Sequence, residues 1–305
     1  VLGAALGFAA WSAIDVDDPG WRRGALSGAL LGAAVSVEYQ VAIVGVVLGG
    51  LLVIRRRWAA LGALVLACVP FAGALLAYQA AAFGSPLSSG YTGKAAHSGA
   101  SLFITGVPDP VTLFHVLVGS RGLLLFTPVV GIGIWGLVQR WRRHRDAGAA
   151  VALWVVGGFL LLQAGWPNPW GGDGPGPRYV TPMLPFLAVG LAEVWRELRP
   201  ALRRWVVGVS LASMVLPTLT MHLVTSKGPL IATHLRSLRE EGLNPTVWSI
   251  ALGPAGWVLY GVTVGGAAAL VVRAVRSDAP APTDRPPVTA SHGAGAVAGP
   301  GRTTP

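Results

Sequence analysis

The sequence predicts an all-α, polytopic transmembrane helical bundle, and composition is the first reason. Hydrophobic residues make up 53% of the 305 residues and charged residues only 12%, whereas an ordinary soluble domain is about 25% charged. A soluble domain of this size cannot bury so much apolar surface and still cover itself with polar groups. A disordered chain needs the opposite composition. Both classes are therefore excluded.

The placement of the basic residues is the second reason. The formal net charge is +10, but the arginines form short clusters between long apolar runs instead of one basic face or motif, so we expect no nucleic-acid partner. The clusters are Arg22–Arg23, Arg55–Arg57, Arg140–Arg145, Arg196–Arg204 and Arg273–Arg276. The positive-inside rule places such clusters in cytoplasmic loops, with the bilayer as the partner of the apolar runs.

Eight apolar runs mark the expected crossings in chain order. They cover residues 1–14, 24–54, 58–82, 115–139, 147–165, 180–195, 205–224 and 248–272. The first run is shorter than the roughly 20 residues that cross a bilayer. Because the chain also begins with Val1, we expect it to be the later part of a longer protein.

The run over residues 24–54 is too long for one crossing. Its 31 residues would form a helix of about 46 Å, against a hydrocarbon core of about 30 Å. Two short crossings with a turn near Glu38 and Tyr39 place the arginines at both ends of the run on the cytoplasmic side, and we prefer this to a single crossing. The result is about eight complete spans plus one partial span.

Two domains follow from this pattern: a multi-span transmembrane domain over residues 1–276 and a disordered Pro/Ala/Gly-rich tail over residues 277–305. The expected location is the plasma (inner) membrane, with several passes and a cytoplasmic C-terminus. The outward segments 83–114, 166–179 and 225–247 are long enough to be functional. The last of them has Arg236 and Glu240 at helical spacing, which predicts an amphipathic helix on the outer surface.

Arg178 is the strongest candidate for binding a ligand. It ends a Gly/Pro-rich stretch that starts at Gly165 and is followed at once by Tyr179 and an apolar run. Bare glycines let a ligand approach the backbone, and a guanidinium beside a helix start suits a phosphate. The alternative is a plain Gly/Pro-rich turn in which Arg178 pairs with Asp173.

Other outward polar residues carry weaker signals. Arg121 lies near the outer edge of the hydrocarbon, where it either snorkels into headgroups or clamps an anionic headgroup. Glu38 and Tyr39 lie at the expected outer turn. The Glu38 carboxylate has three alternative roles there: it orients a sugar hydroxyl, pairs with an arginine, or caps a helix. Tyr91 follows a stretch with turn chemistry.

No metal or cofactor is expected. Asp15, Asp17 and Asp18 lie in a predicted cytoplasmic loop without a second ligand group nearby, so we interpret them as solvated. Cys68 is the single cysteine, which excludes an intrachain disulfide and a cysteine-based zinc cluster. His234 is isolated in the sequence, as is His222, so neither indicates a metal site.

Gly24, Gly28 and Gly32 form two overlapping patterns of small residues four apart. This spacing puts the three glycines on one face of a helix. It is typical of helices that approach each other closely in membranes.

Four segments, in this order, resemble bacterial polytopic glycosyltransferases of the GT-C superfamily, closest to the group related to protein O-mannosyltransferases. They are GALLGAAVSVEY (28–39), FGSPLSSGY (83–91), SRGLLLFTP (120–128) and WGGDGPGPRYVTPMLP (170–185). The resemblance covers about residues 20–195, and the Gly-Pro-Arg-Tyr segment is its most specific part.

The resemblance implies a partial GT-C fold with extracytoplasmic loops and an enzyme that transfers a sugar from a polyprenyl-phosphate carrier to an acceptor on the outer face. The implied substrate-binding residues are Glu38, Tyr39, Tyr91, Arg121, Asp173, Arg178 and Tyr179. The family's proposed base is an aspartate in the first outer loop, which precedes Val1. The catalytic residue is therefore unassigned, and we expect the fragment alone to be inactive. A multi-pass transporter and a non-catalytic envelope-assembly protein remain the alternatives.

Overall fold

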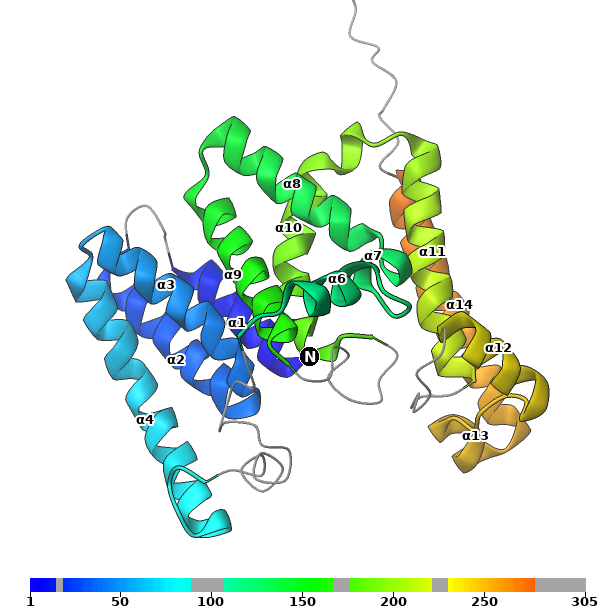
Figure 1. Ribbon diagram of the computed structural model, residues 1–305, viewed down its shortest axis with the longest axis horizontal. Coiled ribbons are helices and arrows are strands. Elements are labelled where there is room, and N and C mark those ends of the chain that lie inside the picture. Colours follow the sequence, from blue (N-terminus) through cyan, green and yellow to red (C-terminus); the bar gives the residue numbers. More distant parts are fainter. Residues whose placement is uncertain (15–18, 89–106, 167–175, 221–229, 278–305) are drawn as a thin grey trace, which may run out of the picture.

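The computed structural model describes residues 1–14, 19–88, 107–166, 176–220 and 230–277. All regular elements within these ranges are helices, so the prediction of an all-α protein is confirmed (Figure 1). The expected tail, apart from Ser277, lies outside the described residues, as do Asp15, Asp17 and Asp18.

The first half of the fold is a layer of antiparallel helices. It consists of α1 (Leu2–Ala13), α2 (Trp21–Val37), α3 (Ala42–Ile54) and α4 (Trp58–Phe83). After α2 the backbone is extended at Glu38 and forms the 3₁₀ helix η1 (Tyr39–Val41), so the chain reverses into α3 where we expected the turn. A second reversal at Arg55–Arg57 makes α4 parallel to α2.

The glycine stripe of α2 lies directly on α4, which confirms the interpretation of its spacing. A Cβ atom on Gly28 would lie 2.1 Å from the carbonyl oxygen of Leu64, and one on Gly24 would lie 2.4 Å from that of Ala60. Only glycine allows two backbones to come this close. The contact also places Arg22–Arg23 and Arg55–Arg57 at the same end of the layer, as the two-crossing interpretation requires.

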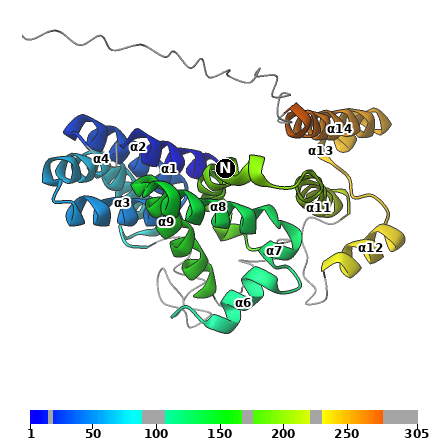
Figure 2. The same ribbon diagram turned by 90° about the horizontal axis from the view of Figure 1, so that it is seen from above.

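Three helices of the second half repeat the arrangement of α2, α3 and α4, and we call each of these sets a three-helix unit. The second unit consists of α8 (Val129–His144), α9 (Ala147–Ala164) and α10 (Leu184–Val194). Here α8 and α10 are parallel, and a Cβ atom on Gly136 would lie 1.8 Å from the carbonyl oxygen of Gly190. The two units lie side by side (Figures 1 and 2). They share one apolar core, which includes Leu48, Phe159 and Phe186.

The two ends of the bundle differ in their charged residues. Gly148, at the start of α9, lies beside Trp11 near the end of α1, so the arginine-rich end of α8 is at the same end as the start of α2. We call this the arginine end. The opposite end, where α2 and α9 finish, contains Glu38 and Trp166, and we call it the site end.

The run over residues 115–139 was expected to be one crossing, but it is not one straight helix. The chain forms α6 (Pro110–Val118) and α7 (Leu123–Phe126), and the pair meets α8 at 96°. Gly119 and Gly122 cause the break, because a Cβ atom on either would lie 2.6 Å from a backbone oxygen. Pro128 then starts a new helix.

Two later runs are also interrupted. The run over residues 180–195 begins with a 3₁₀ helix, η2 (Arg178–Met183), which contains Pro182 and leads into α10. The run over residues 248–272 is split into α13 (Val247–Leu252) and α14 (Pro254–Ser277) by Gly253, whose φ of 58° is left-handed.

Three described helices are long and apolar enough to cross a membrane: α4, α9 and α14. A fourth span results if the bent pair of α6–α7 and α8 counts as one. The described residues thus support a helical membrane protein, but the expected eight spans are not confirmed. Helices α1, α3 and α10 have only 11 to 13 residues, against the roughly 20 of a full span.

The remaining helices are a third 3₁₀ helix, η3 (Trp195–Glu197), α11 (Pro200–Leu219) and α12 (Leu230–Glu240). Helix α12 occurs where the amphipathic pattern predicted a helix. Its His234 is fully buried, and the Nδ1 atom lies 2.7 Å from the Thr220 hydroxyl that follows α11.

Candidate functional site

The site end presents an exposed guanidinium supported by two aromatic rings. The Arg178 Nη2 atom donates a hydrogen bond of 3.3 Å to the Tyr179 hydroxyl, and its guanidinium carbon lies 5.1 Å from the centre of the Tyr179 ring. The ring of Trp166, just after α9, lies 4.9 Å from that of Tyr179. Cation–π contact orients the guanidinium, while the exposed side chain keeps its charge accessible to an anion.

The local sequence explains why Arg178 points outward. Val180 and Met183, on the inner side of η2, are buried in the core. The Thr181 hydroxyl donates a 2.7 Å hydrogen bond to the Arg178 carbonyl and closes the first turn of η2. Arg178 therefore stands at the helix start, as the sequence predicted.

Arg121, unlike Arg178, is buried, with only 4% of its area exposed. It lies in the tight turn between α6 and α7, and its carbonyl oxygen is 3.9 Å from where Gly176 would carry a Cβ atom. The structure thus brings the Arg121 segment next to the Arg178 segment. Burial, together with the positive charge of Arg121, lowers the pKa of His234, so the charge of Arg121 acts on α12.

Glu38 and Tyr39 also lie at the site end, beside the start of α1. The Gln79 amide donates a 3.3 Å hydrogen bond to the Tyr39 hydroxyl, which ties η1 to α4. Glu38 Oε1 lies 3.9 Å from the Val1 amino nitrogen, whereas Oε2 is buried without a hydrogen-bond partner among the described residues. The hydrogen bond of the Arg178 guanidinium goes to Tyr179 and not to Glu38.

Asp173 and Tyr91 lie outside the described residues. The same holds for the proposed ion pair between Asp173 and Arg178, which stays a prediction.

One further residue of the site end is Asp109, which sequence reasoning missed. Its carboxylate caps α6 by accepting hydrogen bonds from the Thr112 backbone N–H (2.9 Å) and hydroxyl (2.8 Å). These bonds lower the pKa of the Asp109 carboxyl. Its own N–H donates to the Ala164 carbonyl at 3.2 Å, which holds α6 near Trp166. The Asp-Pro pair was the available signal, because aspartate caps helices and proline favours their first position.

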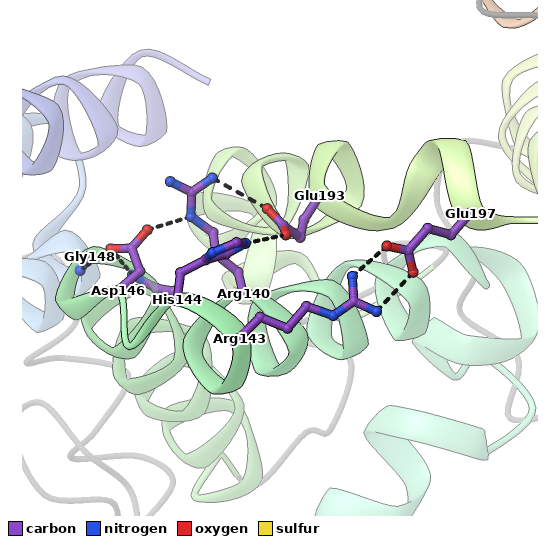
Figure 3. A network of polar contacts seen from close by, with 8 residues as sticks. Arg140, Arg143, His144, Asp146, Gly148, Glu193 and Glu197 are labelled. Atoms are coloured by element: carbon purple, nitrogen blue, oxygen red, sulfur yellow. Dashed lines mark hydrogen bonds and ion pairs between the residues drawn. The ribbon is translucent and has the colours of Figure 1, made fainter. Parts of the chain in front are cut away.

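A charged network at the arginine end holds the second unit together (Figure 3). Asp146 caps α9 through the Gly148 N–H at 2.7 Å and also accepts from Arg140, whose guanidinium is 3.6 Å from Glu193. His144 Nε2 lies 3.1 Å from the other Glu193 oxygen. These contacts join the end of α8 to α9 and α10.

Arg143 and Glu197 add a bidentate pair to this network. Burial raises the pKa of the Asp146 carboxyl, but the bonds from Arg140 and the α9 backbone outweigh burial and lower that pKa overall. The hydrogen bond from Arg143 lowers the pKa of Glu197. Both carboxylates are therefore ionised at neutral pH.

Within the described ranges, no group of three or more His, Cys, Asp or Glu side chains is placed to hold a metal ion. No known protein family, no curated protein and no solved structure matches the chain. Residue chemistry and geometry at the site end therefore carry the functional proposal.

Proposed function

We propose that this protein is a membrane glycosyltransferase of the GT-C type, which binds a polyprenyl-phosphate-linked sugar and transfers the sugar to an acceptor on the extracytoplasmic face. The exposed Arg178 guanidinium, held on Tyr179 and Trp166 at the end opposite the arginine clusters, is the observation that carries the proposal.

In this reaction, an acceptor hydroxyl attacks the anomeric carbon and the bond from that carbon to the phosphate oxygen breaks. The electron pair leaves with polyprenyl phosphate, and the hydroxyl proton passes to a general base that we do not assign. Negative charge grows on the leaving phosphate, which a preorganised guanidinium stabilises. Arg178 has this role because its donors match phosphate oxygens in pairs.

The proposal includes a bundle of about eight spans plus one partial span in the plasma (inner) membrane, with the C-terminus in the cytoplasm. In support, the arginines in the first turn of α2 and before α4 share one end with those at the end of α8, as the positive-inside rule requires of cytoplasmic loops. The short helices α1, α2, α3 and α10 then count as crossings. Arg178 faces the extracytoplasmic side.

Binding of polyprenyl phosphate to purified variants tests the role of Arg178. We expect Arg178→Ala to weaken binding by about tenfold to a hundredfold, since a charge-assisted bond contributes roughly 1.5–3 kcal/mol. Arg178→Lys should recover part of it. Arg239→Ala removes an exposed arginine of α12 and serves as the matched control. Equal affinity of Arg178→Ala and Arg239→Ala would contradict the assignment.

A multi-pass transporter is the second candidate, and two observations favour it. The unit α2–α3–α4 starts at the arginine end while α8–α9–α10 starts at the site end, and transporters often contain units of opposite direction. In addition, the first helix of the pair bent by 96° carries the buried Arg121 in its α6–α7 turn. Counter-transport of a labelled solute in proteoliposomes would favour this candidate, whereas release of polyprenyl phosphate from the donor favours transfer.

A further inference from the structure

An apolar groove of about 360 Å³ lies between α2, α3 and α4. Leu31, Leu64, Phe71 and Leu75 form its walls. Gly45 leaves the floor open, because a Cβ atom there would reach its nearest neighbour, Leu31, only at an ordinary contact distance of 3.7 Å.

The described residues that line the groove offer no free hydrogen-bonding side chain. Its polar lining consists of Ser36 and Cys68, and both already donate to backbone carbonyls of α2: the Ser36 hydroxyl to Gly32 at 2.9 Å and the Cys68 thiol to Gly28 at 3.1 Å. A polar occupant would lose hydrogen bonds to water without replacement. The lining therefore selects a hydrocarbon.

The groove is continuous with an exposed apolar face of α4. Helix α4 is one of the candidate spans, and little of it is buried. Beside the groove, Val65, Leu66 and Val69 expose more than half of their area (54%, 72% and 54%). The hydrocarbon that surrounds this face in a membrane is the chains of bilayer lipids.

The polar end of the groove lies toward the site end. Leu75 is one helical turn before Gln79, whose amide bonds the Tyr39 hydroxyl at 3.3 Å. These two uncharged groups stand where a chain in the groove would meet its headgroup. The groove thus has an apolar body and one polar end, which matches the two parts of an amphiphilic lipid.

We propose that this groove binds one acyl chain of a bilayer phospholipid, with the headgroup beside Tyr39 and Gln79. An apolar cavity of about 150 Å³ accepts one benzene molecule, so 360 Å³ accepts roughly a dozen carbon atoms of one chain. An entire helix, about 10 Å across, does not fit.

The position relative to Arg178 distinguishes this lipid from the sugar carrier. The helices of the first layer contact one another in the order α4, α2, α1 (Figure 1), and α1 in turn contacts η2, which carries Arg178. A carrier whose phosphate sits on Arg178 therefore begins its chain on the other side of this layer. The groove is therefore a separate site from the one around Arg178.

Cys68 provides a native reporter, because it lines the groove and is the single cysteine of the sequence. We would strip the purified protein of lipid in detergent and measure the rate of Cys68 alkylation by N-ethylmaleimide. Dioleoyl phosphatidylcholine should slow alkylation about fivefold, since a bound chain covers the thiol in proportion to site occupancy. Polyprenyl phosphate at the same concentration should leave the rate unchanged.

Native mass spectrometry of retained phospholipid adds a test through the groove itself. Gly45→Leu fills the floor and should reduce retained phospholipid about tenfold by removing packing contacts. Gly50→Leu adds the same side chain to the same helix at a position with open space and should retain the lipid.

Three results would overturn the proposal: alkylation that phosphatidylcholine does not slow, protection by polyprenyl phosphate alone, or equal lipid retention by the two glycine variants. If Gly45→Leu does not fold, the protection of Cys68 from alkylation in the native sequence still tests whether the groove binds phospholipid.

Discussion

Replacing Gly28 by alanine tests the closest contact of the first layer. The new Cβ atom would lie 2.1 Å from the Leu64 carbonyl oxygen, against 3.4–4 Å for an ordinary contact. The neighbour is backbone, so α2 and α4 must separate by more than 1 Å. This movement would also weaken the hydrogen bond from the Cys68 thiol to the Gly28 carbonyl.

The expected magnitude follows from opposing effects. Overpacking costs about 1–3 kcal/mol, and the upper end applies because no flexible side chain can move aside. Alanine recovers about 1 kcal/mol through its higher helix propensity. We therefore expect Gly28→Ala to lower the free energy of unfolding by about 2 kcal/mol.

Gly62→Ala is the matched control, since Gly62 lies on α4 with nothing within 4 Å of the added Cβ atom. It should leave stability unchanged or raise it by up to about 1 kcal/mol. The assay is reversible unfolding in mixed micelles with increasing dodecyl sulfate, followed by tryptophan fluorescence. If the two variants unfold alike, α2 and α4 do not make the glycine contact.

Three further predictions concern charged and buried polar groups. Glu193→Ala removes the shared partner of Arg140 and His144 and should lower the free energy of unfolding by about 1 kcal/mol; an unchanged unfolding curve would exclude a stabilising role. Because their folded-state pKa values are lowered, Asp146 and Glu197 contribute stability that is complete above their unfolded pKa of about 4 and lost as pH falls through the lowered values. Unfolding midpoints from pH 6 to 3 should therefore fall, and a constant midpoint would contradict these shifts. His234 has a lowered pKa, so its contribution is complete above about pH 6.5 and declines as pH falls toward the folded value; His234→Phe should flatten the stability profile between pH 6.5 and 5.

The parts of the fold that the sequence predicted depend on local spacing. The turn at Glu38 followed from a helix too long for a bilayer, and the glycine contact of α2 followed from residues four apart. The helix over Leu230–Glu240 followed from the pairing of Arg236 and Glu240. Such features need no knowledge of distant segments.

The parts that could not be predicted depend on segments far apart in the chain. The bond from Arg143 to Glu197 joins residues 54 positions apart, and hydropathy carries no information on such pairs. The burial of Arg121 likewise requires helices that follow much later. The break after α6 was missed because apolar content hid Gly119 and Gly122, whose close backbone contacts appear only in three dimensions.

The candidate site shows the same division. Arg178 could be identified locally, because glycine, proline and the following helix surround it. Its aromatic partner Trp166 belongs to the end of another helix. Asp109 was overlooked although its Asp-Pro pair marks a helix start.

Two-sided thiol labelling tests most directly the central claim that the Arg178 end and the arginine end lie on opposite sides of the membrane. In a Cys68→Ala background, Val107→Cys reports on the site end, where Val107 is 89% exposed, and Arg145→Cys reports on the arginine end. Intact cells would be treated with a membrane-impermeant maleimide. We predict that Val107→Cys is labelled at once and Arg145→Cys only after permeabilisation. Labelling of both from the same side would contradict the account.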